Sequence, residues 1–317
     1  MDQSIKEFKF DLDAKPQDRW VHIIESYSPV EITSLVNFGR KLLEPYRDAM
    51  SYFEYGLGLY PPSGIMYLGE LNCIAEMCKL SLLEVLALQL IYEAHAACTT
   101  GIWQVNGKPH LFRTMDWETI FLRRFTIKLN VYHHNKLIGE AVTWLGFVGF
   151  FTASSWQHNY SVMVNYRRTS ENLTMTNLGK NLIRLVVGCY PIAYLVRNTV
   201  NVDNYENALK KFETTSLISP CYLTIYHHLN YEKSRILTRD HDGLVSSRQT
   251  LLIQTNCDHD KILPNILHSL QRRKLASEII ATCPTNYGDF LKFPILNDET
   301  IYVYFMTGNT SQVHVIT

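Results

Sequence analysis

The feature that most constrains this sequence is the dipeptide Asn106-Gly107, which separates two runs that alternate as strands do. Both central residues of a type I′ turn need positive φ, and asparagine and glycine adopt it most readily, so the dipeptide predicts a β-hairpin. A two-residue turn also fixes how the strands pair. We therefore expect Thr100 to face Arg113 and Cys98 to face Met115.

This register brings a cysteine, an arginine and an aspartate together. Opposed residues and every second residue along a strand share a face, so Arg113 lies on the face of Cys98, roughly 7 Å away between Cα atoms. Asp116 follows one step past the thiol, beside the backbone nitrogen of Cys98. Pro109 cannot donate to the strand ladder, so it either shifts the register through a bulge or marks an edge.

Composition excludes some classes of function and leaves the number of domains open. A chain of 317 residues can form one large domain or two small ones. The formal net charge is zero, so charge favours neither a nucleic-acid partner nor an acidic membrane surface. The longest uncharged apolar run, 141–155, is too short and too rich in β-forming residues for a membrane-spanning helix.

The cysteines, histidines and N-terminus bear on cofactors and compartment. The seven cysteines are odd in number and lack paired metal-ligand spacing, so we expect reduced thiols, no cofactor and no metal site. His133-His134 and His227-His228 are not natural chelating pairs, because adjacent strand residues point to opposite faces. Residues 1–15 lack the features of a signal peptide, which predicts a cytoplasmic protein, or a lysosomal or secreted one if a leader was removed.

The first 97 residues are predicted to be mostly helical after a short strand at 8–12. Ser28 and Ser81 each begin a capping box, in which the serine and a glutamate three residues later cap each other's backbone N–H groups. The predicted helices run from Ser28 to about residue 55, over 66–77, and from Ser81 towards the hairpin.

From Cys98 onward the pattern changes to strands with intervening helices. The predicted strands after the hairpin are 125–132, 141–155, 160–167, 221–227, 234–239, 250–255, 301–306 and 312–316, and the predicted helices are 175–187, 191–199, 205–214 and 266–281. Strands, then helices, then strands within one unit suggest an α+β fold of two sheets covered by helices.

Cys98 is the candidate nucleophile, although a single cysteine is more often a small buried apolar residue. A cysteine nucleophile needs its thiolate form favoured, and a cation such as Arg113 favours it. Cleavage between Ala97 and Cys98 would also expose an α-amine with an ordinary pKa of about 8, which could act as an internal base.

Amide hydrolysis needs hydrogen-bond donors aimed at the developing oxyanion. Asn256, at the end of a predicted strand, offers a side-chain amide, but a turn-forming asparagine is an equal alternative. Asn165-Tyr166-Arg167 ends another strand, where polar residues are common. Arg272-Arg273 lies on a predicted helix, and a solvated helix face is its simplest explanation.

Several segments, taken in order, resemble the acid ceramidase and N-acylethanolamine-hydrolysing acid amidase family. These are N-terminal-nucleophile hydrolases related to bile salt hydrolases and penicillin V acylases. The similar segments are FDLDAKPQDRW at 10–20, GELNCIAEMCKLSLLEVLALQLIYEAHAACTT at 69–100, FRTMDW at 112–117, VMVNYR at 162–167, ILTRD at 236–240, QTNCDH at 254–259 and PILNDETIYVYFM at 294–306. The resemblance covers nearly the whole chain. It implies a four-layer αββα sandwich, with a helical N-terminal segment at 1–97 and a catalytic domain at 98–317.

The resemblance also implies roles for matching residues. Cys98 would be the nucleophile and, after self-cleavage at Ala97, the new N-terminus. The implied catalytic residues are Cys98, Arg113, Asp116, Asn256, Tyr166 through a backbone N–H, and Arg272, with Arg273 as an alternative to the last; the expected substrate contacts are Asn165, Trp117, Met115 and Trp144. Three sites depart from the family pattern: Tyr166 replaces glutamate, Thr114 replaces asparagine, and residues 152–159 replace a glycine-rich turn.

The implied function is hydrolysis of fatty-acyl amides, of the ceramide or N-acylethanolamine type, through an acyl-thioester on Cys98. The expected partner is the lipid amide substrate, with transient contact to a membrane surface, and the two fragments would stay associated after cleavage. Two alternatives remain open. One is an N-acyltransferase that uses the same thioester, and the other is a catalytically silent lipid-binding protein on the same fold.

Overall fold

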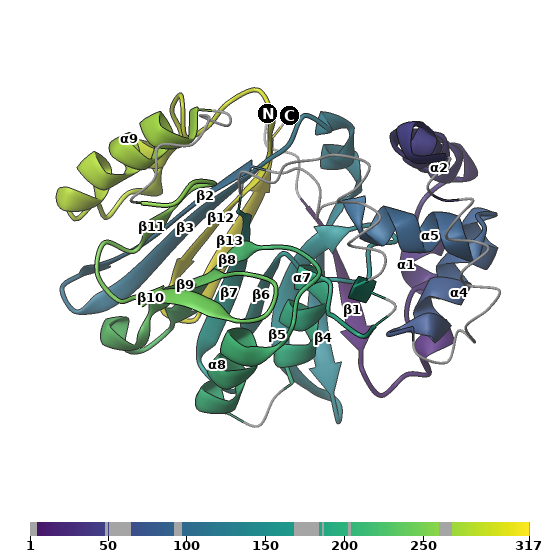
Figure 1. Ribbon diagram of the computed structural model, residues 1–317, viewed down its shortest axis with the longest axis horizontal. Helices are drawn as coiled ribbons and strands as arrows, with labels where there is room; N and C mark the ends of the chain where they lie inside the picture. Colours follow the sequence, from purple (N-terminus) through teal and green to yellow (C-terminus); the bar gives the residue numbers. More distant parts are fainter. Residues whose placement is uncertain are drawn as a thin grey trace.

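The computed structural model describes residues 5–47, 50, 65–91, 97–167, 184–185, 187–201, 204–259 and 268–316. Two β-sheets form the centre of the fold, and helices lie on their outer faces (Figure 1). This arrangement confirms the α+β class and the two helix-covered sheets that the sequence predicts.

The larger sheet combines an N-terminal strand with strands from the middle of the chain. Its order is β1 (Lys6–Asp11), β4 (Thr126–His133), β5 (Lys136–Trp144), β6 (Thr152–Ser155), β7 (Tyr160–Tyr166), β8 (Cys221–His227), β9 (Arg235–Arg239) and β10 (Leu244–Arg248). β1 pairs with β4 in parallel, whereas the other neighbouring strands are antiparallel. The segment before Cys98 therefore supplies an end strand of this sheet.

The smaller sheet is built around the predicted hairpin. Its order is β11 (Ile253–Gln254), β2 (Ala97–Val105), β3 (Lys108–Asp116), β12 (Thr300–Thr307) and β13 (Thr310–Val315). The turn has φ of 50° at Asn106 and 78° at Gly107, and Cys98 pairs with Met115 as predicted. Pro109 causes no register shift between β2 and β3, and it lies one residue past the last pair that β3 forms with β12.

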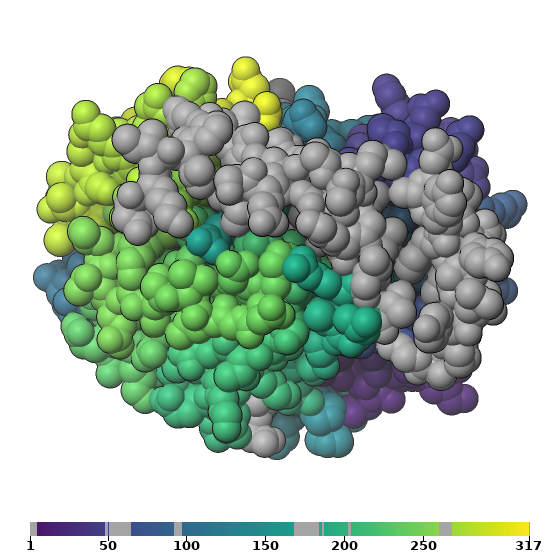
Figure 2. Space-filling model, viewed as in Figure 1, coloured from purple at the N-terminus to yellow at the C-terminus, as the bar shows by residue number. Residues whose placement is uncertain are grey.

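Helices cover three sides of the sheets. The N-terminal group is α1 (Val21–Glu25), α2 (Pro29–Leu43), α4 (Leu68–Cys78) and α5 (Leu82–Gln89); α7 (Ile192–Thr199) and α8 (Tyr205–Thr214) pack on the larger sheet, and α9 (Ser269–Ala281) packs on β2 and β11. The 3₁₀ turns are Pro16–Asp18, Glu44–Tyr46, Ile120–Phe125, Tyr231–Lys233 and Tyr287–Phe290. In Figure 2 the yellow-green segment that includes α9 and the purple N-terminal segment lie at opposite ends of the visible face. None of the described helices combines the length and apolar character needed to cross a bilayer.

Both predicted capping boxes are present, at Ser28 and Ser81, and they start α2 and α5. Other predictions need correction. The stretch 141–155 is the end of β5 and all of β6 with a buried turn between them, because the chain reverses after Trp144. Only Ile253–Gln254 of the predicted strand 250–255 pairs, and β10 was not predicted. The end of the first predicted helix, beyond 50, and most of the predicted helix 175–187 lie outside the described residues.

A buried ionic group joins the N-terminal helices to the larger sheet. Glu70 of α4 is fully buried, and Arg197 of α7 contacts both of its carboxylate oxygens at 2.5 and 2.7 Å. Arg19 and the Trp20 indole N–H each donate to the same carboxylate at 2.8 Å. The Arg197 guanidinium also stacks over the Tyr67 ring, 4.1 Å from its centroid. This group fixes the position of α4 against the rest of the fold.

Candidate active site

Cys98 is the second residue of β2, and its side chain is fully buried between the two sheets. Its thiol lies 3.6 Å from the Met115 sulfur and 3.4 Å from Nη2 of Arg113. The hairpin therefore places the thiol beside a guanidinium, as its register predicts.

Arg113 is held by the strands of the larger sheet. Its Nη2 donates to the Val164 carbonyl at 2.9 Å, and its Nη1 donates to the Phe151 carbonyl and the Thr152 hydroxyl. Thr152 in turn hydrogen-bonds the Tyr302 hydroxyl at 2.9 Å. The guanidinium is fully buried, and this set of oxygens positions its charge at the thiol.

Arg272 of α9 reaches the same strand from its opposite face. Its Nη1 donates to the Cys98 carbonyl and the Thr99 hydroxyl, each at 2.7 Å, and lies 3.3 Å from Oδ2 of Asp116. Its Nη2 donates to the Asn256 side-chain oxygen at 3.0 Å. Arg273, the alternative, is only half-buried and donates to backbone carbonyls of Cys257 and Asp258. The geometry therefore favours Arg272 as the arginine of the site.

Asp116 is the last residue of β3, and it pairs with Ala97 across the hairpin. Besides Arg272, it accepts from the Thr300 hydroxyl at 2.8 Å and from the Thr114 hydroxyl at 3.2 Å. Complete burial raises the pKa of Asp116 above its ordinary value, although Arg272 and the two hydroxyls oppose the rise. The same burial lowers the pKa of Arg272. Burial therefore favours the protonated form of this carboxyl group, and Arg272 favours the ionised form.

Asn256 connects the start of β2 to the end of β7. Its side-chain oxygen accepts from the Cys98 backbone N–H at 2.9 Å, and its Nδ2 donates to the Tyr166 carbonyl at 2.9 Å. Its own N–H donates to the Ser269 hydroxyl at the start of α9. These long-range bonds identify Asn256 as part of the cluster, beyond the local turn that the sequence also allowed.

The four expected substrate contacts fall into two groups. Trp117 and Trp144 pack with 5.3 Å between ring centroids and line an apolar cavity. Met115 lies at the thiol, and Asn165 joins the strands: it accepts from the Thr100 hydroxyl at 2.8 Å and donates to the Gln254 carbonyl at 3.1 Å. Neither residue is among those that line this cavity.

The cavity lies between the N-terminal helices and the end of β5. Its lining residues, apart from one glutamine and two glycines, have apolar or thiol side chains: Leu35, Val36, Phe38, Gly39, Leu42, Ile74, Cys78, Leu80, Val85, Leu88, Gln89, Ile91, Trp117, Leu122, Trp144, Leu145, Gly146 and Phe147. Trp144 of the cavity wall packs against Phe151, with 4.7 Å between ring centroids, and the Phe151 carbonyl accepts from Arg113, so the cavity wall adjoins the polar cluster. An apolar chain attached to a reacting carbonyl fits this arrangement.

Sequence reasoning assigned no role to three threonines of the cluster. Thr99 and Thr114 stand next to predicted residues, but only the strand pairing shows that their hydroxyls contact Arg272 and Asp116. Thr300 lies opposite Asp116 in the pairing of β12 with β3. The sequence contains no local signal for that pairing, because it joins segments about 180 residues apart.

The two sheets covered by helices form the fold of the N-terminal-nucleophile hydrolases, and the candidate cysteine lies near the start of β2. Among solved structures, the Caenorhabditis elegans N-acylethanolamine-hydrolyzing acid amidase ortholog matches this fold with a TM-score of 0.56 and 16% sequence identity, over 67% of this chain and 93% of that chain. No family model matches the chain.

Sequence relatives extend the comparison over nearly the whole chain. An uncharacterized protein of Acanthamoeba polyphaga mimivirus is 36% identical, over 93% of this chain and 94% of its own length. The N-acylethanolamine-hydrolyzing acid amidase of Mus musculus is 22% identical over 95% and 85%, and the acid ceramidase of Heterocephalus glaber is 23% identical over 94% and 82%. The chain belongs to the acid ceramidase and N-acylethanolamine-hydrolysing acid amidase family.

Proposed function

We propose that this protein is a cysteine amidase that hydrolyses fatty-acyl amides. The observation that carries the proposal is the position of the Cys98 thiol, 3.4 Å from the Arg113 guanidinium and close to an apolar cavity lined by Trp117 and Trp144. A guanidinium stabilises the thiolate that must attack, and an apolar cavity accepts the acyl chain of the substrate. The names of the relatives point to the same chemistry.

In the proposed reaction the Cys98 sulfur attacks the amide carbonyl, a C–S bond forms and the C–N bond breaks. The proton of the thiol passes through the α-amine of Cys98 to the leaving amine, so that amine departs neutral. Water then cleaves the thioester, releasing a fatty acid and restoring the thiol. Arg272 donates to the Cys98 carbonyl and holds this residue in place, and Asp116 in turn contacts Arg272.

The oxyanion of each step needs donors. We assign this role to the side-chain amide of Asn256 and a backbone N–H near Tyr166. The Asn256 amide donates to the Tyr166 carbonyl, so the assignment requires it to exchange that partner for the substrate oxygen. Since a backbone donor serves here, tyrosine in place of the glutamate of the family is compatible with the role.

An α-amine on Cys98 requires cleavage of the Ala97–Cys98 bond. β2 runs through both residues, so the proposed cleavage lies at the start of this strand. The products would be residues 1–97 and 98–317, and the pairing of β1 with β4 would keep them together. The amphiphilic substrate would be collected through transient contact with a membrane surface.

The nature of the amine is not fixed by the cavity, because ceramide and N-acylethanolamine present the same secondary amide to the same groups. A test uses both substrates with wild-type protein and with Cys98→Ala and Cys98→Ser, and Cys283→Ser, which alters an exposed thiol, as the control. We expect hydrolysis by the wild type and Cys283→Ser only. Full turnover by Cys98→Ala would refute the proposal.

Two companion measurements separate the alternatives. Product analysis with added amines or alcohols distinguishes hydrolysis from acyl transfer, since a transferase yields the new amide or ester. An electrophilic acyl probe that leaves Cys98 unlabelled would indicate a silent lipid-binding protein. Intact mass tests processing: we expect fragments of 1–97 and 98–317 from the wild type and one chain from Cys98→Ala.

A further inference from the structure

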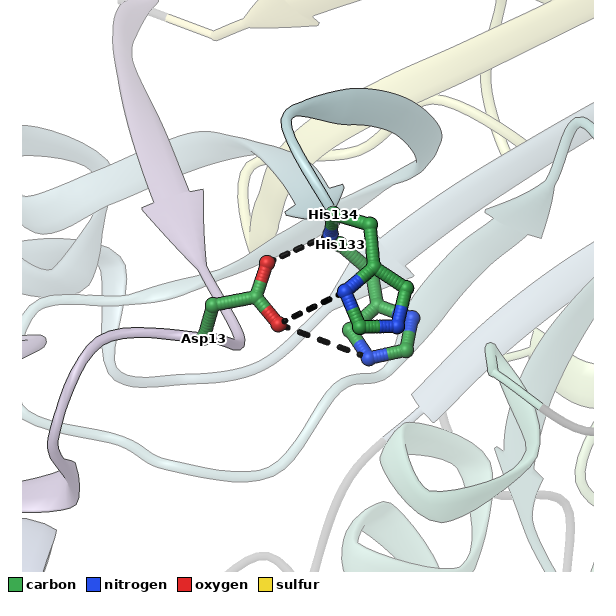
Figure 3. A group of neighbouring side chains, drawn as sticks. All are labelled: Asp13, His133 and His134. Carbon is green, nitrogen blue, oxygen red and sulfur yellow. Dashed lines mark hydrogen bonds and ion pairs between the residues drawn. The ribbon is translucent and has the colours of Figure 1, made fainter.

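Asp13, His133 and His134 meet beside the ends of β1 and β4, outside the cluster around Cys98 (Figure 3). Each side chain offers one potential metal-ligand atom, and all three atoms lie within 4.8 Å of one another. Within the described part of the chain, this is the one group of three or more such side chains that meets this condition.

The turn between β4 and β5 brings the two histidines together. His134 and Asn135 have φ of 50° and 58°, so they form a turn like that of Asn106-Gly107, and strand alternation stops at His133. The imidazole rings lie 3.9 Å apart between centroids at an interplanar angle of 31°. The prediction that adjacent histidines point to opposite faces is therefore wrong here, because His134 is a turn residue with positive φ.

Asp13 is oriented towards both rings. One of its oxygens, Oδ2, accepts from the His134 backbone N–H, which leaves Oδ1 at 3.5 Å from Nε2 of His133 and 3.5 Å from Nδ1 of His134 (Figure 3). The Asp13 N–H donates to Asp11 Oδ1 at 3.0 Å, so its backbone is fixed as well. These carboxylate-to-ring distances are at the outer limit of a hydrogen bond. They are also close to the distance between two ligand atoms of a tetrahedral zinc ion, which is roughly 3.3 Å when each ligand lies about 2.0–2.1 Å from the ion.

We infer that Asp13, His133 and His134 form a binding site for a divalent transition-metal ion of the zinc type. Two imidazole nitrogens and one carboxylate oxygen match the ligands that zinc prefers, and water completes the coordination because all three side chains are partly exposed. Asp13 follows β1, whereas His133 ends β4 and His134 follows it, so the ion would tie the first segment of the chain to the larger sheet. That the ion would hold cleaved fragments together rests on the proposed function. The existence of the metal site does not rest on it.

The test is a zinc titration of the untagged full-length chain by calorimetry at about pH 7.5. We expect the wild type to bind one zinc ion at these residues. The affinity for that ion should fall more than about tenfold in His133→Ala, His134→Ala and Asp13→Asn. His314→Ala, on β13 of the other sheet, is the matched control and should bind as the wild type does. Cys98→Ala should also retain the ion, which separates this site from binding by the reactive thiol.

A second measurement tests what the ion does. Zinc should slow hydrogen exchange of the β1 amides in the wild type but leave them unchanged in His133→Ala. Absence of zinc binding, or binding unaffected by the three substitutions, would overturn the inference. A chain that binds zinc in this way and hydrolyses no amide would refute the proposed function alone, so the two failures are distinguishable.

Discussion

Two fully buried carboxylates, Glu70 and Asp116, have different donors, and their pKa values shift in opposite directions. Glu70 receives Arg197 on both oxygens, together with Arg19 and the Trp20 indole. Burial alone would raise its pKa, but Arg197 and the other donors hold the pKa of Glu70 below its ordinary value. Asp116 has one close guanidinium, at 3.3 Å, and two hydroxyls, and burial raises its pKa.

The difference separates a structural ion pair from a reactive one. A carboxylate with two guanidiniums stays ionised and joins elements, as Glu70 joins α4 to α7. A carboxylate with fewer charged donors keeps part of its affinity for a proton, which suits a group beside an amine that must exchange one. We propose that Asp116 is poised in this way.

The largest expected effect is that of Asp116→Asn on amide hydrolysis. The substitution keeps the shape but removes the charge that faces Arg272, so turnover should fall by a factor of roughly 10²–10⁴, as for loss of an acid–base group. Initial rates on an N-acyl amide measure it, with the exposed Asp289→Asn as control. Near-normal turnover by Asp116→Asn would remove Asp116 from the mechanism.

Glu70→Gln should mainly affect folding. It leaves Arg197 and Arg19 facing a neutral group in a buried site, which costs about 3–5 kcal/mol of the free energy of unfolding. Urea denaturation measures it. The control is Glu278→Gln, which breaks an exposed pair with Lys274 and should change stability by less than about 0.5 kcal/mol. Equal effects of the two variants would mean that Glu70 has no structural role.

Arg272→Lys compared with Arg273→Lys tests which arginine belongs to the site. Lysine cannot reproduce the planar fork with which Arg272 contacts the Cys98 carbonyl and Asn256. We therefore expect kcat/KM to fall by an amount that corresponds to about 1.5–3 kcal/mol of lost transition-state stabilisation. Arg273→Lys should keep nearly full activity. The reverse order of effects would show that the assignment from geometry is wrong.

The smallest effect is a difference in titration. In Cys98→Ala, carboxyl carbon NMR should give Glu70 a midpoint below about 4.3 and Asp116 one above about 3.9. The depressed pKa of Glu70 means that its stabilisation is present above pH 4.3 and is lost as pH falls through the folded-state pKa. The raised pKa of Asp116 means that its contribution is present at low pH and is lost as pH rises through the folded-state pKa. A midpoint above about 4.3 for Glu70, or below about 3.9 for Asp116, would contradict the contrast.

The sequence predicted the part of the site that local geometry determines. Asn106-Gly107 set the register of β2 and β3, and with it the contact between Arg113 and Cys98, because a two-residue turn allows one pairing. The capping boxes at Ser28 and Ser81 are equally local, and both helices start where predicted.

Contacts between distant segments could not be predicted from the residues alone. Asn256 had a turn as an equal explanation and Arg272 a solvated helix face, and only the packing of α9 on β2 shows their bonds to Cys98. The cluster of Asp13 with His133 and His134 was missed for a different reason. Strand alternation predicts opposite faces for the two histidines, but β4 ends at His133 and His134 lies in the turn.

The parallel pairing of β1 with β4 has a consequence for the timing of any cleavage. In the intact chain, Lys6 and Ile127 are joined by about 120 intervening residues, so their encounter is intramolecular and occurs at a high effective concentration. If the bond before Cys98 is cut, β1 and β4 belong to separate fragments, and only non-covalent contacts keep them paired. Folding therefore has to precede cutting, and a short N-terminal fragment added separately would need a high concentration to find its place in the sheet.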